Sequence, residues 1–191
     1  GWLRHGNSTE RQRSFVNVNF GSMGDDITLA EGVAVAAERP VTIVCGDGAF
    51  MMNLQELATI RHNGLPVHAV VFSNGGYNAL RRTWKRYFNG VNAGCDADSG
   101  ISFPSFEKVA AAFGLPYKAC RRNNEIEDSL AWLFQQDGPA ILVVSENLAP
   151  VNMPCVISRL RTDGTSEPAW LSDMSPYIER ELYEKLMVRE R

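Results

Sequence analysis

Apolar runs of strand length recur along most of the chain. Residues 41–45, 67–72 and 140–145 are almost continuously apolar and rich in β-branched residues, which is typical of strands buried on both faces. Residues 116–120 form a shorter candidate strand. Residues 14–19 alternate between polar and apolar positions, and this pattern predicts a further strand.

Helical patterns occupy the segments between these strands. Asn53 is expected to cap one of the helices, because Glu56 follows three residues later as in a capping box. Residues 91–104 are rich in Gly, Asp, Ser and Asn and predict a loop. The spacing of apolar residues predicts helices over 27–38, 53–63, 75–86, 105–113 and 125–134.

Apolar strands that alternate with helices indicate the fold class. Such strands need cover on both faces, and the connecting helices supply it. The sequence therefore predicts an α/β domain of the doubly wound, Rossmann-like kind, with a parallel sheet and helices on both faces.

The character of the chain changes after Glu146. Residues 147–170 hold three prolines and show no clear period. Ser175 and Pro176 resemble a helix cap followed by proline at the first helical position, and they predict a helix over 177–187. We expect a domain over residues 1–147 and an extended tail with a terminal helix over 148–191.

Charge and composition exclude several classes of partner. The chain has 191 residues and a net charge of −3, and its one dense basic cluster, over residues 81–86, is interpreted as a solvated helix face. This argues against nucleic-acid binding. No apolar run approaches the roughly 18 residues of a membrane span. Four scattered cysteines without a signal peptide predict a cytoplasmic protein with reduced thiols.

A glycine-rich motif follows the first apolar strand directly. Gly46, Asp47 and Gly48 stand between that strand and a helix, where parallel sheets bind ligands. Glycines let the backbone approach a phosphate, and the carboxylate of Asp47 can hold the cation that neutralises it. A single Gly-Asp-Gly is also a common turn, so the motif is weak in isolation.

A second polar motif follows the neighbouring strand. Asn74 lies 27 positions after Asp47, one strand–helix–strand step away, so both side chains are expected at the same edge of the sheet. Their oxygens are ligands that Mg²⁺ accepts, with a backbone carbonyl, diphosphate oxygens and water completing the coordination. The coupled pair of motifs is more specific than either alone.

Residues 46–57 together with 74–77 resemble the thiamine-diphosphate motif of the acetolactate synthase and pyruvate decarboxylase superfamily. The resemblance covers roughly residues 15–147. It implies that Asp47, Asn74 and the carbonyl of Gly76 bind Mg²⁺. It also places the diphosphate on the backbone of this motif, which includes Gly46, Gly48, Ala49 and Tyr77. One departure is Ser73, which stands where the family has a first Asn.

The segment Gly21-Ser22-Met23-Gly24 is similar to the part of this family that grips the aminopyrimidine ring. By this resemblance Met23 wedges the cofactor into a V shape, and the Gly21 carbonyl accepts a hydrogen bond from the 4′-amino group. The alternative is a glycine-flanked turn before a helix. The following pair, Asp25 and Asp26, departs from the apolar or small residues usual in the family.

Two residues after the second motif bear on the substrate. Trp84 resembles a tryptophan that lines the substrate pocket of acetolactate-synthase-like enzymes; the alternative is packing on a helix face. Leu80 stands where pyruvate decarboxylases place a catalytic Glu, which argues against a simple pyruvate decarboxylase.

The acid that activates the cofactor is missing from this chain. In the family, a Glu on a separate pyrimidine-binding domain protonates the aminopyrimidine ring, usually across a dimer interface. The resemblance therefore implies a partner domain, either on the same full-length chain or on another subunit of a homo- or hetero-oligomer. The catalytic residues proper are expected there.

Three functions stay open at this level. The first is the diphosphate-binding domain of an acetolactate-synthase-like enzyme that decarboxylates a small 2-keto acid and joins it to an acceptor carbonyl. The second is one subunit of a two-chain decarboxylase similar to sulfopyruvate or phosphonopyruvate decarboxylase. The third is a non-catalytic cofactor-binding domain, because fold alone does not prove function.

Overall fold

The computed structural model describes residues 12–16, 21–147, 154–161 and 163–187. The chain divides into two compact units, Ser14–Pro150 and the segments Gly1–Arg13 with Val151–Arg191, which are described separately. Of the strand predicted over 14–19, residues 14–16 have no regular structure and 17–19 lie outside the described residues. The predicted division of the chain at residue 147 stays a prediction.

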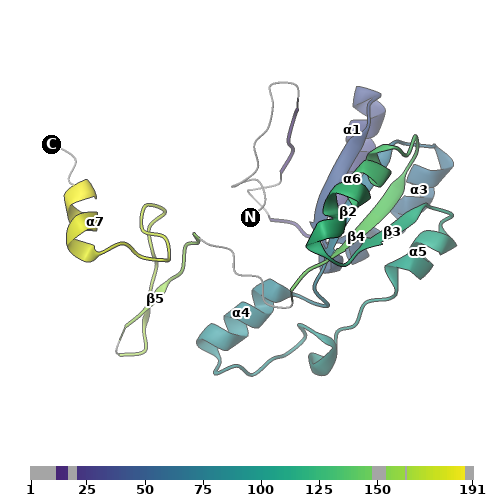
Figure 1. Ribbon diagram of the computed structural model, residues 1–191. Helices are drawn as coiled ribbons and strands as arrows, with labels where there is room; N and C mark the ends of the chain where they lie inside the picture. Colours follow the sequence, from purple (N-terminus) through teal and green to yellow (C-terminus); the bar gives the residue numbers. More distant parts are fainter. Residues whose placement is uncertain (1–11, 17–20, 148–153, 162, 188–191) are drawn as a thin grey trace. The chain divides into compact units, whose positions relative to one another are not determined.

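A four-stranded parallel sheet forms the centre of the larger unit (Figure 1). Its strand order is β1-β2-β4-β3, so β2 lies next to β4 rather than β3. All four strands predicted between residues 41 and 145 are confirmed to within one residue at each end. They are β1 (Val41–Gly46), β2 (Val67–Ser73), β3 (Tyr117–Cys120) and β4 (Ala140–Ser145).

Helices cover both faces of this sheet, which confirms the predicted fold class. One buried cluster joins Ile43 and Val71 of the sheet to α1, α3 and α5, whose bounds are Asp25–Ala37, Glu56–His62 and Phe106–Ala112. On the other face Val70 and Leu142 pack with Leu133 of α6 (Ile126–Phe134). Alternate residues of β2 thus serve two cores, as the near-continuous apolar runs predicted. Burying each such aliphatic side chain contributes about 1.5–3 kcal/mol.

The predicted cap at Asn53 is wrong. The chain enters helical geometry at Asp47, in α2 (Asp47–Phe50), and continues through the 3₁₀ turn η2 (Met51–Asn53) into α3. Asn53 therefore lies inside a helical path rather than before it. Its side-chain amide instead donates to the carbonyl of Gly24, 2.6 Å away. Its Oδ1, the atom that a cap would use, accepts from the side chain of Gln55 at 3.0 Å.

The other connections follow the sequence closely. The helix predicted over 75–86 is α4 (Asn78–Tyr87), which starts after an irregular turn. The predicted loop over 91–104 contains one 3₁₀ turn, η3 (Ala97–Ser99), and a second such turn, η4 (Asn123–Glu125), leads into α6.

The smaller unit holds the two-stranded sheet β5 (Arg159–Leu160) and β6 (Ser166–Glu167), and the helix α7 (Arg180–Met187). The predicted helix start at Ser175 is wrong, because the N–H and C=O of Ser175 pair with the backbone of Cys155. Glu179 caps the helix instead, accepting a hydrogen bond from the N–H of Leu182 at 3.1 Å.

Candidate functional site

Asp47 lies at the carboxyl end of β1, where the strand gives way directly to a helical turn. Its side chain is only 2% exposed. The register pairs Gly46 of β1 with Phe72 of β2, so both strands end at the same edge of the sheet. A buried carboxylate is costly unless it is paired or hydrogen-bonded, so its partners define the site.

Four donors surround the Asp47 carboxylate. Oδ1 accepts from the N–H of Gly48 at 2.8 Å. Oδ2 accepts from the N–H groups of Asn74 and Gly75 at 2.9 and 2.8 Å, and more weakly from the hydroxyl of Ser73 at 3.4 Å. The structure thus joins the two motifs that the sequence singled out. Ser73, the departure from the family pattern, contributes to this junction.

The side chain of Asn74 is held on one side only. Its Nδ2 donates to Oε2 of Glu146 at 3.0 Å. Its Oδ1 is buried and has no hydrogen-bond partner among the described residues. Buried acceptors normally have partners, so this oxygen is available to accept a bond from or coordinate a ligand. An amide oxygen beside a carboxylate suits a hard cation such as Mg²⁺.

Gly76 is fixed by close backbone packing. At its φ of +158° a Cβ atom would lie 2.1 Å from the carbonyl oxygen of Cys95 and 2.5 Å from Nη2 of Arg81. Tyr77 donates its N–H to the same Cys95 carbonyl at 2.7 Å. Any larger side chain at position 76 would therefore push the loop away from its support.

Arg81 braces the same loop from α4. Its Nη2 donates to the backbone carbonyl of Asn74 at 3.0 Å, and its Nε lies 3.3 Å from Oδ2 of Asp96. The Asp96 carboxylate also accepts from the Ser99 hydroxyl, and these hydrogen bonds and Arg81 hold the pKa of Asp96 below its usual range. One member of the basic cluster is therefore structural rather than a solvated charge.

The ring of Tyr77 leaves no room for a side chain at Gly48. A Cβ at Gly48 would lie 2.2 Å from the Tyr77 ring. That ring in turn makes an edge contact with Phe103, with centroids 5.9 Å apart. The N–H of Gly48 is already engaged by Asp47, whereas the next residue, Ala49, is only half-buried.

The upstream segment is anchored next to these motifs. Gly24 has a φ of +89°, and a Cβ there would lie 2.6 Å from that of Met52. Its carbonyl accepts the hydrogen bond from Asn53 already described. Gly21, Ser22 and Met23 are exposed, Met23 by 47%. Packing in the hydrophobic core therefore does not explain why a side chain as large as methionine stands at position 23.

Two groups near the start of α1 and the end of β1, Asp26 and Cys45, have raised pKa values. Burial raises the pKa of the Asp26 carboxyl, and the charge of Asp25 raises it further. Burial likewise raises the pKa of the Cys45 thiol, with Asp26 and Asp47 adding to the effect.

Trp84 contacts its own helix and the following loop. Its indole N–H donates to the carbonyl of Ala93 at 3.0 Å, and its ring lies 4.6 Å from that of Phe88, centroid to centroid. These are packing contacts, and packing on a helix face is the alternative that the sequence left open for Trp84. A role of Trp84 in a substrate pocket stays a prediction.

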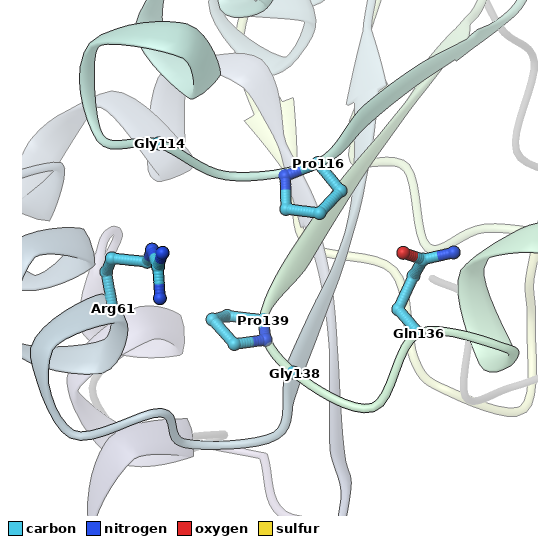
Figure 2. Close-up of a pocket in the computed structure, with 6 residues that line it drawn as sticks. All are labelled: Arg61, Gly114, Pro116, Gln136, Gly138 and Pro139. Atoms are coloured by element: carbon cyan, nitrogen blue, oxygen red, sulfur yellow. The ribbon is translucent and has the colours of Figure 1, made fainter.

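A hollow of about 230 Å³ lies near the starts of β3 and β4, at the opposite ends of the strands from Asp47 (Figure 2). Two prolines, two glycines and the side chains of Arg61 and Gln136 line it. It plays no part in the Asp47 site. In the part of the chain that the structure describes, no group of three His, Cys, Asp or Glu residues gathers as a metal site, and no helix could span a membrane.

Glu146 is the site residue that sequence reasoning missed. It follows β4 directly, as Asp47 follows β1 and Asn74 follows β2. All three residues are polar and follow a buried strand, and this shared position could have identified Glu146 from the sequence. The sequence did not predict that β4 lies beside β2.

Comparisons with known proteins agree with this geometry. The family model described as "Thiamine pyrophosphate enzyme, C-terminal TPP binding domain" matches residues 1–144. The chain is 31% identical over 160 residues to the acetolactate synthase isozyme 2 large subunit of Escherichia coli, covering 80% of this chain and 28% of that protein. It is 33% identical over 143 residues to a probable acetolactate synthase large subunit of Methanococcus aeolicus, covering 74% and 23%.

A solved structure shows the same fold. The thiamine diphosphate-dependent 4-hydroxybenzoylformate decarboxylase of Rhodococcus jostii superposes with a TM-score of 0.60 at 24% identity, covering 66% of this chain and 24% of that one. The chain thus spans about a quarter of the length of the proteins it matches. It belongs to the C-terminal thiamine-pyrophosphate-binding domains of the acetolactate-synthase-like superfamily of thiamine-diphosphate-dependent enzymes.

Proposed function

We propose that this chain binds Mg²⁺ and the diphosphate of thiamine diphosphate in an enzyme that breaks and forms carbon–carbon bonds of 2-keto acids. The observation that carries the proposal is the buried, unpartnered Oδ1 of Asn74 beside the Asp47 carboxylate. It supports a bound cation and argues against a domain that has lost its ligand.

The metal ligands of the proposal are the Asp47 carboxylate, Asn74 Oδ1 and the carbonyl of Gly76. One carboxylate with neutral oxygens suits Mg²⁺, which keeps water and phosphate oxygens in its shell. Among the described residues, Asp47 Oδ1 accepts from the Gly48 N–H alone, and so it keeps lone pairs for a cation. The diphosphate would lie against the backbone at Gly46, Gly48 and Ala49, with Tyr77 supporting Gly48 from behind.

The other end of the cofactor is assigned to the upstream segment. Gly21 and Ser22 would face the aminopyrimidine ring, and the exposed Met23 would press on the cofactor from below. The bond from Asn53 to Gly24 keeps this segment beside the diphosphate site. When bound, thiamine diphosphate supplies the carbanion chemistry, and the protein supplies position and electrostatics.

The complete reaction needs a pyrimidine-binding domain that contributes the activating Glu. That domain would come from the same chain or from a partner subunit of a homo- or hetero-oligomer. Relatives at 31 and 33% identity are named acetolactate synthases, which favours decarboxylation followed by carboligation over decarboxylation alone. The exposed Leu80 on α4 supplies no acid for the simpler decarboxylase reaction.

Calorimetric titration tests the proposal. Thiamine diphosphate is titrated with and without Mg²⁺ into the enzyme that contains this chain and a pyrimidine-binding domain, and the titration is repeated with Asp47→Ala. Mg²⁺-dependent binding that disappears in the variant supports the proposed site. Equal binding by both proteins would place the cofactor elsewhere, and no binding by either would make the assignment wrong. Product analysis with pyruvate then separates carboligation from decarboxylation.

A further inference from the structure

We propose that Glu146 is a positioning residue that turns the side-chain oxygen of Asn74 toward the cation. The inference rests on the proposed function, because it concerns the same metal site. It starts from two facts about one side chain: Asn74 Nδ2 lies 3.0 Å from Glu146 Oε2, and Asn74 Oδ1 is buried without a partner among the described residues.

The chemistry of the two groups leaves one orientation for the amide. An ionised carboxylate only accepts hydrogen bonds, so it must face the NH₂ of Asn74 and not its oxygen. A flipped amide would set two acceptors 3.0 Å apart, which is repulsive. Glu146 therefore decides which end of Asn74 is presented to the ligand, an assignment that an isolated amide leaves open.

Glu146 is itself held by the sheet. Its N–H donates to the carbonyl of Ser73 at 2.9 Å, which continues the β2–β4 ladder one step beyond the pair Ser73 and Ser145. The residue that carries the carboxylate is thus bonded to the residue next to Asn74. The distance between the two side chains follows from strand register rather than from a mobile loop.

The backbone of Asn74 is fixed by other groups. Its N–H is bound by Asp47, and its carbonyl accepts from Arg81. Among the hydrogen bonds that Asn74 makes with the described residues, only the bond to Glu146 restrains the torsion of its amide. Outer-shell partners of this kind commonly change metal affinity by about 10–100-fold when they are removed.

Two variants of Glu146 test the role. Glu146→Ala removes the acceptor, and Glu146→Gln keeps an acceptor oxygen for the amide while removing the charge. Mg²⁺ is titrated calorimetrically into each assembled enzyme at saturating thiamine diphosphate, and thermal unfolding is measured without metal. We expect Glu146→Ala to weaken Mg²⁺ binding by about 10-fold or more and Glu146→Gln to stay close to the parent protein.

The outcomes separate this proposal from its alternatives. Parent-like Mg²⁺ affinity in Glu146→Ala overturns it, and so does equal weakening in both variants, which would indicate a charge effect instead. Glu127→Ala, at an exposed carboxylate on α6, is the matched control and should bind Mg²⁺ like the parent. If the parent protein itself fails to bind Mg²⁺ with the cofactor, the proposed function has failed rather than the role of Glu146.

Discussion

The side-chain amide of Asn53 donates a hydrogen bond of 2.6 Å to the carbonyl of Gly24, across 29 residues of sequence. This bond ties the segment proposed to hold the aminopyrimidine ring to the helical path that starts at Asp47. The two ends of the proposed cofactor site are therefore mechanically connected within this chain.

Asn53→Ala should loosen that connection. We expect the free energy of unfolding to fall by about 1 kcal/mol, the typical contribution of one such hydrogen bond, and the affinity for thiamine diphosphate to fall as well. Urea denaturation and calorimetry measure the two effects. Asn63→Ala is the control, because Asn63 makes the same kind of bond to the Thr59 carbonyl at the exposed end of α3. Parent-like cofactor affinity in Asn53→Ala would contradict the connection.

Asp47 should matter for stability even without metal. Asp47→Ala leaves the N–H groups of Asn74 and Gly75 without their acceptor, so we expect the metal-free protein to lose about 2–4 kcal/mol. Urea denaturation in the presence of a chelator gives this value. Asp137→Ala, at an exposed carboxylate, should change it little. Unchanged metal-free stability would mean that Asp47 acts only through the cation.

Gly48→Ala should be destabilising because of the Tyr77 ring. The added methyl group would lie 2.2 Å from that ring, and overpacking of this kind costs about 1–3 kcal/mol. The double variant Gly48→Ala with Tyr77→Leu should recover part of the loss, which a double-mutant cycle measures. Gly32→Ala, on α1 with open space around it, should instead stabilise the protein by up to about 1 kcal/mol. Additive effects of the first two substitutions would rule out the contact.

Asp26 should make stability depend on pH. The pKa of Asp26 is raised in the folded protein, mainly by burial. The stabilisation that its protonated form gives is therefore complete below the ordinary pKa of 3.8, and it is lost as the pH rises through the folded-state pKa. Asp26→Asn should therefore raise the unfolding temperature at pH 7 and lose this advantage near pH 3. Asp128→Asn, in the first turn of α6, should lower stability at pH 7 because it removes a charge that the helix dipole favours. A loss of stability in Asp26→Asn at pH 7 would reverse the interpretation.

Local pattern was enough to predict the four strands of the parallel sheet and the meeting of Asp47 with Asn74, although it also predicted a strand over 14–19 whose described residues have no regular structure. Val70 and Val71 pack on opposite faces of β2, so burial on both sides appears directly as an unbroken apolar run. Asn53 shows where local reasoning failed. Its spacing from Glu56 is that of a capping box, but the chain is already helical from Asp47, so Asn53 does not stand at a helix start. Its amide N–H instead reaches a carbonyl 29 residues away.

Glu146 escaped prediction because its role depends on strand order. The sequence gives four strands but not that β4 inserts between β2 and β3. Only that order sets a residue after β4 beside a residue after β2. The tail helix starts late for a related reason: the carbonyl of Ser175, which in a cap would accept the first intrahelical bond, accepts from the N–H of Cys155 instead.

The register between β2 and β4 has a consequence for folding. Asn74 lies 27 positions from Asp47 and 72 from Glu146, so the cluster forms only after three strands that are distant in sequence have aligned. A slip of one residue would send the carboxylate of position 146 to the opposite face of the sheet. A cation that binds this cluster would select the correctly aligned chain, and at about 100 times its Kd it would stabilise that state by about 2.7 kcal/mol. Metal binding would then favour the correctly aligned sheet late in folding.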